Sequence, residues 1–273
     1  MDVSFVILTW NSERYIVKCL HSLLVALRDK PYRYEIFIID NGSNDGTVSI
    51  LNSFQTTSPE QFFPIYLEKN TGTTYSRNLA LKQAKGQYIC ILDSDVEVSS
   101  ETLAELSRTL EQHPQIGMVA PKLLYPNGKL QKSTDDFPTI LTKARRYIFL
   151  KAMEAREHAL AVETAQSPAM LREVDYAISA MWLLKREVLD KVGLLDENIF
   201  YAPEDVDYCL RIWQAGYTIV YNPNVACIHH TQEISRGLKL NKALLSHIYG
   251  LAYYFWKHHY LFRRPKNIGK RRN

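Results

Sequence analysis

The first half of the chain alternates short apolar runs with amphipathic segments. The apolar runs are Val3–Leu8, Tyr34–Ile39, Ile65–Leu67 and Tyr88–Leu92. The amphipathic segments, in which apolar residues recur at helical spacing, are Glu13–Leu27, Thr47–Phe54 and Ser76–Ala84. Strands and helices in alternation predict an α/β fold, with a mostly parallel central sheet flanked by helices.

The second half is less regular, but no linker rich in glycine, serine or proline divides the chain. The expected helices are Ser99–Gln112, Pro138–Leu160 and Glu204–Gln214. The expected strands are Ile116–Ala120, Tyr217–Tyr221 and Val225–Ile228, with a hairpin turn at Tyr125–Gly128 and a buried run at Val174–Leu184. We therefore expect one continuous domain over residues 1–232 and a C-terminal appendage over residues 233–273.

Polar residues follow the predicted strands of the first half, where each strand ends. Right-handed connections between parallel strands place these ends at one edge of the sheet, which is where ligands of such sheets bind. The polar segments are Thr9–Asn11, Asp40–Ser43, Asn70–Gly72 and Asp93–Asp95. None contains the Gly-x-Gly-x-x-Gly turn of a dinucleotide-binding site, which argues against an NAD or FAD enzyme.

The segment Asp93-Ser94-Asp95 places two carboxylates one residue apart at the end of an apolar strand. Like charges so close repel each other unless a cation lies beside them. Mg²⁺ and Mn²⁺ prefer oxygen ligands of this kind. The alternative is a solvated turn that caps a helix, because turns rich in Asp and Asn are common.

Other acids and two histidines are candidates for chemistry, each with a structural alternative. Asp40 at a strand tip can accept a hydrogen bond from a nucleotide base or ribose, or can belong to a turn. Glu204 and Asp205 open a helix, where acids are favoured, but a carboxylate near a bound sugar can serve as a general base. His229 and His230 end the last strand, where they can contact a metal or phosphate or simply be structural.

In their order and spacing, these pieces resemble the family 2 glycosyltransferases, inverting enzymes with the GT-A fold, and among them the rhamnosyltransferase-like bacterial enzymes. The resemblance runs from Val3 to about Arg236. The segments that carry it are Val3–Asn11, Ile38–Thr47, Asn70–Gly72, Ser76–Asn78, the DXD motif Asp93–Asp95, Gly193–Glu197 and Glu204–Arg211.

The resemblance implies a nucleotide-sugar half over about residues 1–120 and an acceptor half over about residues 121–232. Asp205 would be the general base with Glu204 beside it, and Asp95 would ligate Mg²⁺ or Mn²⁺. Either His229 or His230 would complete the metal or diphosphate site. Residues near the donor would be Thr9, Asn11, Glu13, Asp40, Asn70, Gly72, Arg77, Asp93 and Ser94. Further along, the pair Ser235 and Arg236 resembles a phosphate-contacting element.

The implied reaction moves a sugar from dTDP-rhamnose or a UDP-sugar to a hydroxyl of a glycan or a lipid-diphosphate-linked acceptor, in the assembly of a cell-surface polysaccharide. The Gln-x-x-Arg-Trp signature of processive synthases is absent from the sequence, so we expect transfer of one or a few sugars.

Two other readings remain open from the sequence. A sugar nucleotidyltransferase would also use acids at a sheet edge, but it needs a basic, glycine-rich loop for a triphosphate, and Thr9–Glu13 has neither feature. A non-catalytic protein that binds nucleotide sugars would not require the full set of acids.

The charge of the chain is unevenly distributed. The formal net charge is +4, but the residues after position 233 include ten bases and no acid, so residues 1–233 carry 4 − 10 = −6. Asn241–Trp256 predicts an amphipathic helix, followed by a tail of aromatic and basic residues that suits the surface of an anionic membrane. Packing on the core, or on a second copy in a homodimer, is the alternative.

We expect a cytoplasmic protein that lies peripherally on the inner face of the cell membrane. The chain has no secretory signal and no apolar stretch of about 20 residues that could span a bilayer. Its four cysteines form no Cys-x-x-Cys pair and are expected to be reduced thiols. No nucleic-acid-binding motif is recognisable.

Overall fold

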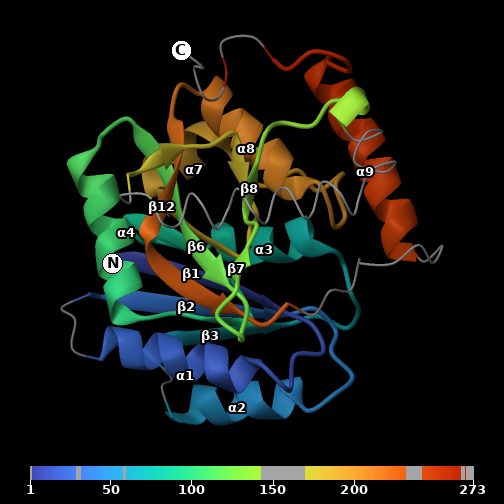
Figure 1. The fold of residues 1–273 in the computed structure, drawn as a ribbon. Helices are drawn as coiled ribbons and strands as arrows, with labels where there is room; N and C mark the ends of the chain where they lie inside the picture. The colour runs from blue at the N-terminus through green and yellow to red at the C-terminus, as the bar shows by residue number, and fades with distance from the viewer. Residues whose placement is uncertain are drawn as a thin grey trace.

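The computed structural model describes residues 2–28, 32–57, 60–142, 170–231 and 242–265, together with Ile268. A ten-stranded sheet runs through the molecule, with helices on both faces (Figure 1). Its main path is β3-β2-β1-β4-β11-β6-β12-β5, while β7 pairs with β6 and β9 pairs with β12. A separate two-stranded sheet joins β8 (Thr134–Asp135) to β10 (Tyr176–Ala177).

The first four strands are parallel, as the sequence predicts. They are β1 (Val3–Thr9), β2 (Tyr34–Asp40), β3 (Phe62–Tyr66) and β4 (Tyr88–Asp93). The prediction of the third strand was displaced toward the C-terminus, because Pro64 lies in its middle. Proline is tolerated there since β3 is the edge strand of the sheet.

Alternating side chains of β1 divide the core into two layers. Phe5 and Ile7 pack with helices α1 (Ile16–Leu27), α2 (Thr47–Thr57) and α4 (Ser100–Gln112). Val6 packs on the other face, with α3 (Thr73–Leu81), α7 (Arg186–Val192), α8 (Glu204–Gln214) and α9 (Lys242–His258). In Figure 1, α1 and α2 lie below the sheet and α7 and α8 lie above it.

The second half extends the sheet with mixed strand directions. Strand β11 (Met181–Lys185) is antiparallel to both β4 and β6 (Ile116–Leu124), whereas β12 (Thr218–His229) is parallel to β6. The short strands are β5 (Val96–Glu97), β7 (Leu130–Gln131) and β9 (Arg172–Glu173).

Two predictions for this half differ from the structure in detail. The two strands predicted near the end of the domain are one strand, β12, whose register shifts between Asn222 and Ala226. Pro223 lies in this irregular stretch and cannot donate a ladder hydrogen bond, which is why the pattern read as two strands. The predicted helix Pro138–Leu160 lies mostly outside the described residues.

The loop that precedes α8 is bound to α3 by hydrogen bonds. Asn78, fully buried on α3, donates to the carbonyl oxygen of Leu195 at 2.9 Å and accepts from the amide of Leu195 at 3.0 Å. The hydroxyl of Thr74 donates to the carbonyl of Ile199 at 2.7 Å. These bonds fix one half of the molecule against the other.

The predicted C-terminal amphipathic helix forms α9 and packs on the domain. Tyr254 and Phe255 are buried against the layer that contains α8. The opposite face of α9 carries large apolar side chains that are more than half exposed, which are Leu245, Ile248, Tyr249 and Trp256. None of the described helices has the length and apolar character required to cross a membrane.

We predict that Asn78→Ala lowers the free energy of unfolding by about 2–4 kcal/mol, because it leaves the amide and carbonyl of Leu195 buried without partners. Urea titration followed by circular dichroism measures the change. Gln83→Ala, at an exposed position just after the same helix, is the control and should cost less than about 0.5 kcal/mol. Equal losses for the two variants would show that Asn78 does not join the halves.

Candidate active site

Two buried polar atoms lie side by side where β1 and β2 end. Thr9 and Asp40 are register partners, and their exposed fractions are 1% and 2%. One carboxylate oxygen of Asp40 accepts the amide of Ser43 at 3.0 Å. Its other oxygen, Oδ1, and the hydroxyl of Thr9 have no hydrogen-bond partner within the described part of the chain. Because buried polar groups are normally paired, this pair fits a ligand that offers hydrogen bonds.

Asn11 and Glu13 brace the two loops beside this pair. The amide side-chain oxygen of Asn11 accepts from the backbone of Asn44 at 2.8 Å, and Asn11 itself lies in the left-handed region with φ of 50°. Glu13 accepts from the amide of Gly46 at 3.0 Å. Both side chains therefore shape the strand-end loops of β1 and β2 through contacts within the protein.

Asn70 and Gly72 form the loop before α3. Asn70 accepts from the side chain of Asn41 at 3.1 Å and from the amide of Gly72 at 3.0 Å. A Cβ atom on Gly72 would lie 2.4 Å from the carbonyl oxygen of Phe200, and its φ is 89°. Glycine is therefore required where this loop meets the segment before α8.

Asp93, Asp95 and His229 form a cluster whose ligand atoms all lie within 4.8 Å of one another. Asp93 ends β4 and Asp95 follows two residues later. His229 ends β12, which is placed there by pairing with β5, where His229 is opposite Val96. The Nε2 atom of His229 is 3.3 Å from Oδ1 of Asp95. Strands from both halves of the chain thus build one acidic corner.

The second nitrogen of the His229 ring is held by Gln131 of β7. Nδ1 lies 2.9 Å from the side-chain oxygen of Gln131, which assigns the proton of a neutral ring to Nδ1 and leaves Nε2 facing the acids. Burial opposes protonation of His229, but the hydrogen bond and charge of Asp95 outweigh it and raise its pKa. Gln131 could not be predicted from the sequence, because no motif marks a residue in a hairpin strand so far from the histidine.

This donor set fits a hard divalent cation. Two carboxylates and one imidazole are ligands that Mn²⁺ and Mg²⁺ accept. Burial raises the pKa of Asp93, the Arg77 guanidinium opposes the rise, and the Asp95 carboxylate adds to it. A cation bound here would remove the repulsion between the two carboxylates.

Two neighbouring candidates, His230 and Ser94, have hydrogen-bond partners outside the cluster. His230 points to Glu97, with Nε2 2.5 Å from the carboxylate, because successive residues of a strand face opposite sides. The hydroxyl of Ser94 pairs with that of Ser12 at 2.8 Å and holds the β4 turn against the β1 loop. Ser235 and Arg236 lie outside the described residues.

Arg77 is a fully buried cation that bridges the cluster to α8. Its Nη2 donates to Asp93 at 2.5 Å, and its Nη1 donates to the hydroxyl of Ser179 at 2.9 Å. Ser179 in turn donates to Oε1 of Glu204 at 3.1 Å, and this oxygen is 3.7 Å from Arg77. Arg77 therefore acts within the protein, between the cluster and the start of α8.

Glu204 and Asp205, the first residues of α8, have different surroundings. Burial raises the pKa of Glu204 to about 8, and the adjacent Asp205 carboxylate adds to the rise while Arg77 opposes it. Burial therefore favours the protonated form of Glu204. Asp205 is partly exposed and accepts the amide of Val206 at 2.8 Å. One buried and one partly exposed carboxyl group therefore lie side by side.

Relatives of this chain include several glycosyltransferases. It is 26% identical over 261 residues to the uncharacterized glycosyltransferase YfnE of Bacillus subtilis, covering 84% of this chain and 64% of YfnE. It is 23% identical to the N-acetylglucosaminyl-diphospho-decaprenol L-rhamnosyltransferase of Mycobacterium tuberculosis, covering 82% of this chain and 75% of that enzyme. The chain spans only 22% of a longer relative from Sinorhizobium fredii.

Solved glycosyltransferase structures share the fold. Staphylococcus aureus TarS in complex with UDP-GlcNAc matches with a TM-score of 0.59 and 22% identity, over 85% of this chain and 59% of that one. A mannosyltransferase of Pyrobaculum calidifontis in complex with GDP-Man and Mn²⁺ has a TM-score of 0.59 and 20% identity, over 85% and 58%. Both resemblances support the fold predicted from the sequence.

The family comparison favours a glycosyltransferase over the two alternatives, a nucleotidyltransferase and a non-catalytic binding protein. The model of the family described as "Glycosyl transferase family 2" matches residues 4–193, which include the strand-end loops, Arg77, and Asp93 and Asp95 of the acidic cluster. The chain therefore belongs to glycosyl transferase family 2 and has the GT-A fold of the solved glycosyltransferases.

Proposed function

We propose that the protein transfers one sugar from a nucleotide-diphosphate donor to an acceptor hydroxyl with inversion at the anomeric carbon. The observation that carries the proposal is the bridge from Asp93 through Arg77 and Ser179 to Glu204. It connects the cluster suited to a donor diphosphate with the carboxyl pair suited to deprotonate an acceptor.

The unpaired atoms of Thr9 and Asp40 are the binding site for the nucleotide base in this proposal. Oδ1 of Asp40 can accept the N3–H of uracil or thymine, and the hydroxyl of Thr9 can pair with a neighbouring base oxygen. These contacts suit both pyrimidine bases, and the family resemblance favours dTDP-rhamnose as donor, with a UDP-sugar as second choice. The relative named as an L-rhamnosyltransferase supports rhamnose as the sugar. The TarS structure in complex with UDP-GlcNAc supports a UDP-sugar.

Mg²⁺ or Mn²⁺ held by Asp95, His229 and Asp93 would supply positive charge to the leaving diphosphate. The chain's own contribution is to hold the ligands in place. Gln131 fixes the His229 ring, and Arg77 balances the charge of Asp93. The mannosyltransferase structure that contains Mn²⁺ supports a divalent ion.

Asp205 is the general base of the proposed reaction. It takes the proton of the acceptor hydroxyl as that oxygen attacks the anomeric carbon from the face opposite the diphosphate, so no covalent glycosyl-enzyme forms. Burial of Glu204 beside it favours the protonated form of that side chain, which would add no second negative charge.

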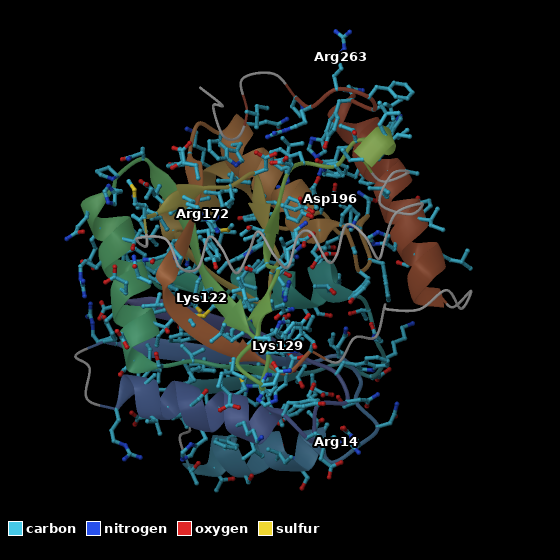
Figure 2. All side chains as sticks on the ribbon, viewed as in Figure 1. Arg14, Lys122, Lys129, Arg172, Asp196 and Arg263 are labelled. Carbon is cyan, nitrogen blue, oxygen red and sulfur yellow. The ribbon has the colours of Figure 1, made fainter. Side chains whose placement is uncertain are left out.

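The proposed acceptor is a glycan or a lipid-diphosphate-linked sugar in the assembly of a cell-surface polysaccharide. The outer face of α9, defined here as Leu245, Ile248, Tyr249 and Trp256, would rest on the inner surface of the cell membrane. Arg263 points away from the molecule in Figure 2. Apart from Lys257 and Arg264, which pair with acids of the domain, the bases after position 233 would complement anionic lipids. Placement at the membrane would bring the active site to lipid-linked substrates.

We predict that Asp205→Asn lowers transfer by a factor on the order of 10² to 10⁴, because the amide cannot take the acceptor proton. Nucleotide release from UDP-, dTDP- and GDP-sugars measures turnover, and calorimetry with the free nucleotide and Mn²⁺ measures donor-site binding, which should be unchanged. Asp190→Asn, on the exposed surface of α7, is the matched control. Wild-type turnover of Asp205→Asn would refute the assignment of the base.

The two adjacent histidines provide a matched pair for the metal site. His229→Gln should weaken Mn²⁺ binding on the order of tenfold or more, because a ligand is lost, whereas His230→Gln should leave it unchanged. Calorimetric titration of the apoprotein with Mn²⁺ alone gives both affinities. Similar affinities for the two variants would place the ion elsewhere.

For the membrane surface, we predict that Ile248→Gln/Trp256→Gln lowers binding to phosphatidylglycerol vesicles by about tenfold or more, since a buried large apolar side chain contributes roughly 1.5–3 kcal/mol. Co-sedimentation measures the bound fraction. Val17→Gln/Val25→Gln, on the exposed side of α1, is the control. Unchanged sedimentation of the α9 variant would refute the membrane surface. Analytical ultracentrifugation tests the alternative: if the wild-type protein is a dimer and the α9 variant is a monomer, the outer face of α9 binds a second copy of the chain.

A further inference from the structure

The inner face of α9 lies directly on the segment that leads into the candidate base. A Cβ atom on Gly250 would be 2.2 Å from the carbonyl oxygen of Ala202 and 3.2 Å from Cδ of Pro203. Gly250 is buried, so the backbone of α9 touches the chain two residues before Glu204. Any larger residue at this position would push the helix and the segment apart.

Lys257 of α9 binds one aspartate before that segment and one aspartate after it. Nζ of Lys257 lies 2.6 Å from Oδ2 of Asp196 and 2.7 Å from Oδ1 of Asp207. Asp196 comes before the segment, and Asp207 follows Asp205 by two residues on α8. Residues 196–207, with Asp205 among them, are therefore closed into a loop by a single cation. Figure 2 labels Asp196 between α8 and α9.

The two aspartates are built to accept this cation. Asp207 is 1% exposed and also binds Arg211 at 2.9 Å and His258 at 2.8 Å. Burial alone would raise its pKa, but the hydrogen bond from His258 and the charges of Arg211 and Lys257 lower it. Asp196 accepts Lys257 and the hydroxyl of Tyr253 at 3.0 Å. Its pKa is lowered to about 2: burial opposes the shift, but the hydrogen bond from Lys257 outweighs it.

The other side of the same segment is fixed by α3. The carbonyl oxygens of Ile199 and Phe200 accept from the hydroxyl of Thr74 at 2.7 Å and the amide of Thr73 at 2.6 Å. The segment is thus held between a helix of the nucleotide-sugar half and α9. Removing the α9 contacts would leave it attached on one side only.

We propose that Lys257 is a positioning residue for catalysis, which fixes Asp205 relative to the bound donor by closing residues 196–207 against α9. The inference rests on the proposed role of Asp205. It assigns to α9 a function that does not depend on the membrane, because Lys257 lies on the inner face of the helix. Lys257 acts through Asp205 and contacts no reacting atom.

The test compares Lys257→Met, which keeps the length of the side chain without its charge, with Lys257→Arg, which keeps the charge. Turnover is nucleotide release from the sugar nucleotide that the wild-type enzyme cleaves fastest in a panel of UDP-, dTDP- and GDP-sugars. We expect Lys257→Met to lower kcat by ten- to a hundredfold with unchanged KM for the donor, and Lys257→Arg to restore most of the rate.

Lys82→Met is the matched control. Lys82 is half exposed and lies 3.7 Å from Glu197, so it pairs with the same segment from the side of α3. Its loss should change kcat less than twofold. Gly250→Ala is a second variant. Its added methyl group would push α9 away from Ala202 without removing a charged side chain, and it should lower kcat with unchanged KM for the donor.

A double-mutant cycle separates positioning from general stability. If Lys257 acts through Asp205, Lys257→Met should have no further effect on the residual rate of Asp205→Asn. Additive losses, or a rise in donor KM equal to the loss in kcat, would overturn the inference and leave Lys257 a structural residue. An inactive Asp205→Asn together with a fully active Lys257→Met would refute the inference and leave the proposed function standing.

Discussion

The buried guanidinium of Arg77 is the interaction on which the arrangement of the site depends. A buried charge is costly unless it is paired and hydrogen-bonded, and the two terminal nitrogens of Arg77 bind Asp93 and Ser179, with Glu204 3.7 Å away. These partners come from β4, from the loop before β11 and from the start of α8. Satisfying one cation therefore fixes three parts of the chain that no single strand or helix connects.

A second cation, Lys257, also holds separate parts of the chain together, farther from the acidic cluster. Arg77 joins the acidic cluster to Glu204 at the start of α8, and Lys257 joins Asp207 of the same helical turn to Asp196 in the loop before it. Asp205 lies on the first turn of α8, between the residues that these two cations bind. The backbone that carries the proposed base is therefore fixed on both sides.

Much of the donor side could be predicted from the sequence, because parallel strands bring their ends to one edge whatever the details of packing. Asp40, Asp93 and Asp95 lie at that edge for this reason. The partners of individual side chains could not be predicted. Nothing in the spacing distinguishes His229 from His230, since their contacts with Asp95 and Glu97 are set by the pairing of β12 with β5. The bracing contacts of Asn11 and Glu13 likewise depend on how two loops meet in space.

The pairing of β5 with β12 also has a consequence for how the protein folds. Asp95 and His229 are separated by 229 − 95 = 134 positions along the chain, and they meet only when the last strand joins the far end of the sheet. Contacts of such high sequence separation form late, because the entropy of closing the loop is lost before the contact stabilises anything. A cation that needs both side chains would therefore bind after the sheet is complete, so its uptake during refolding reports the final step of assembly.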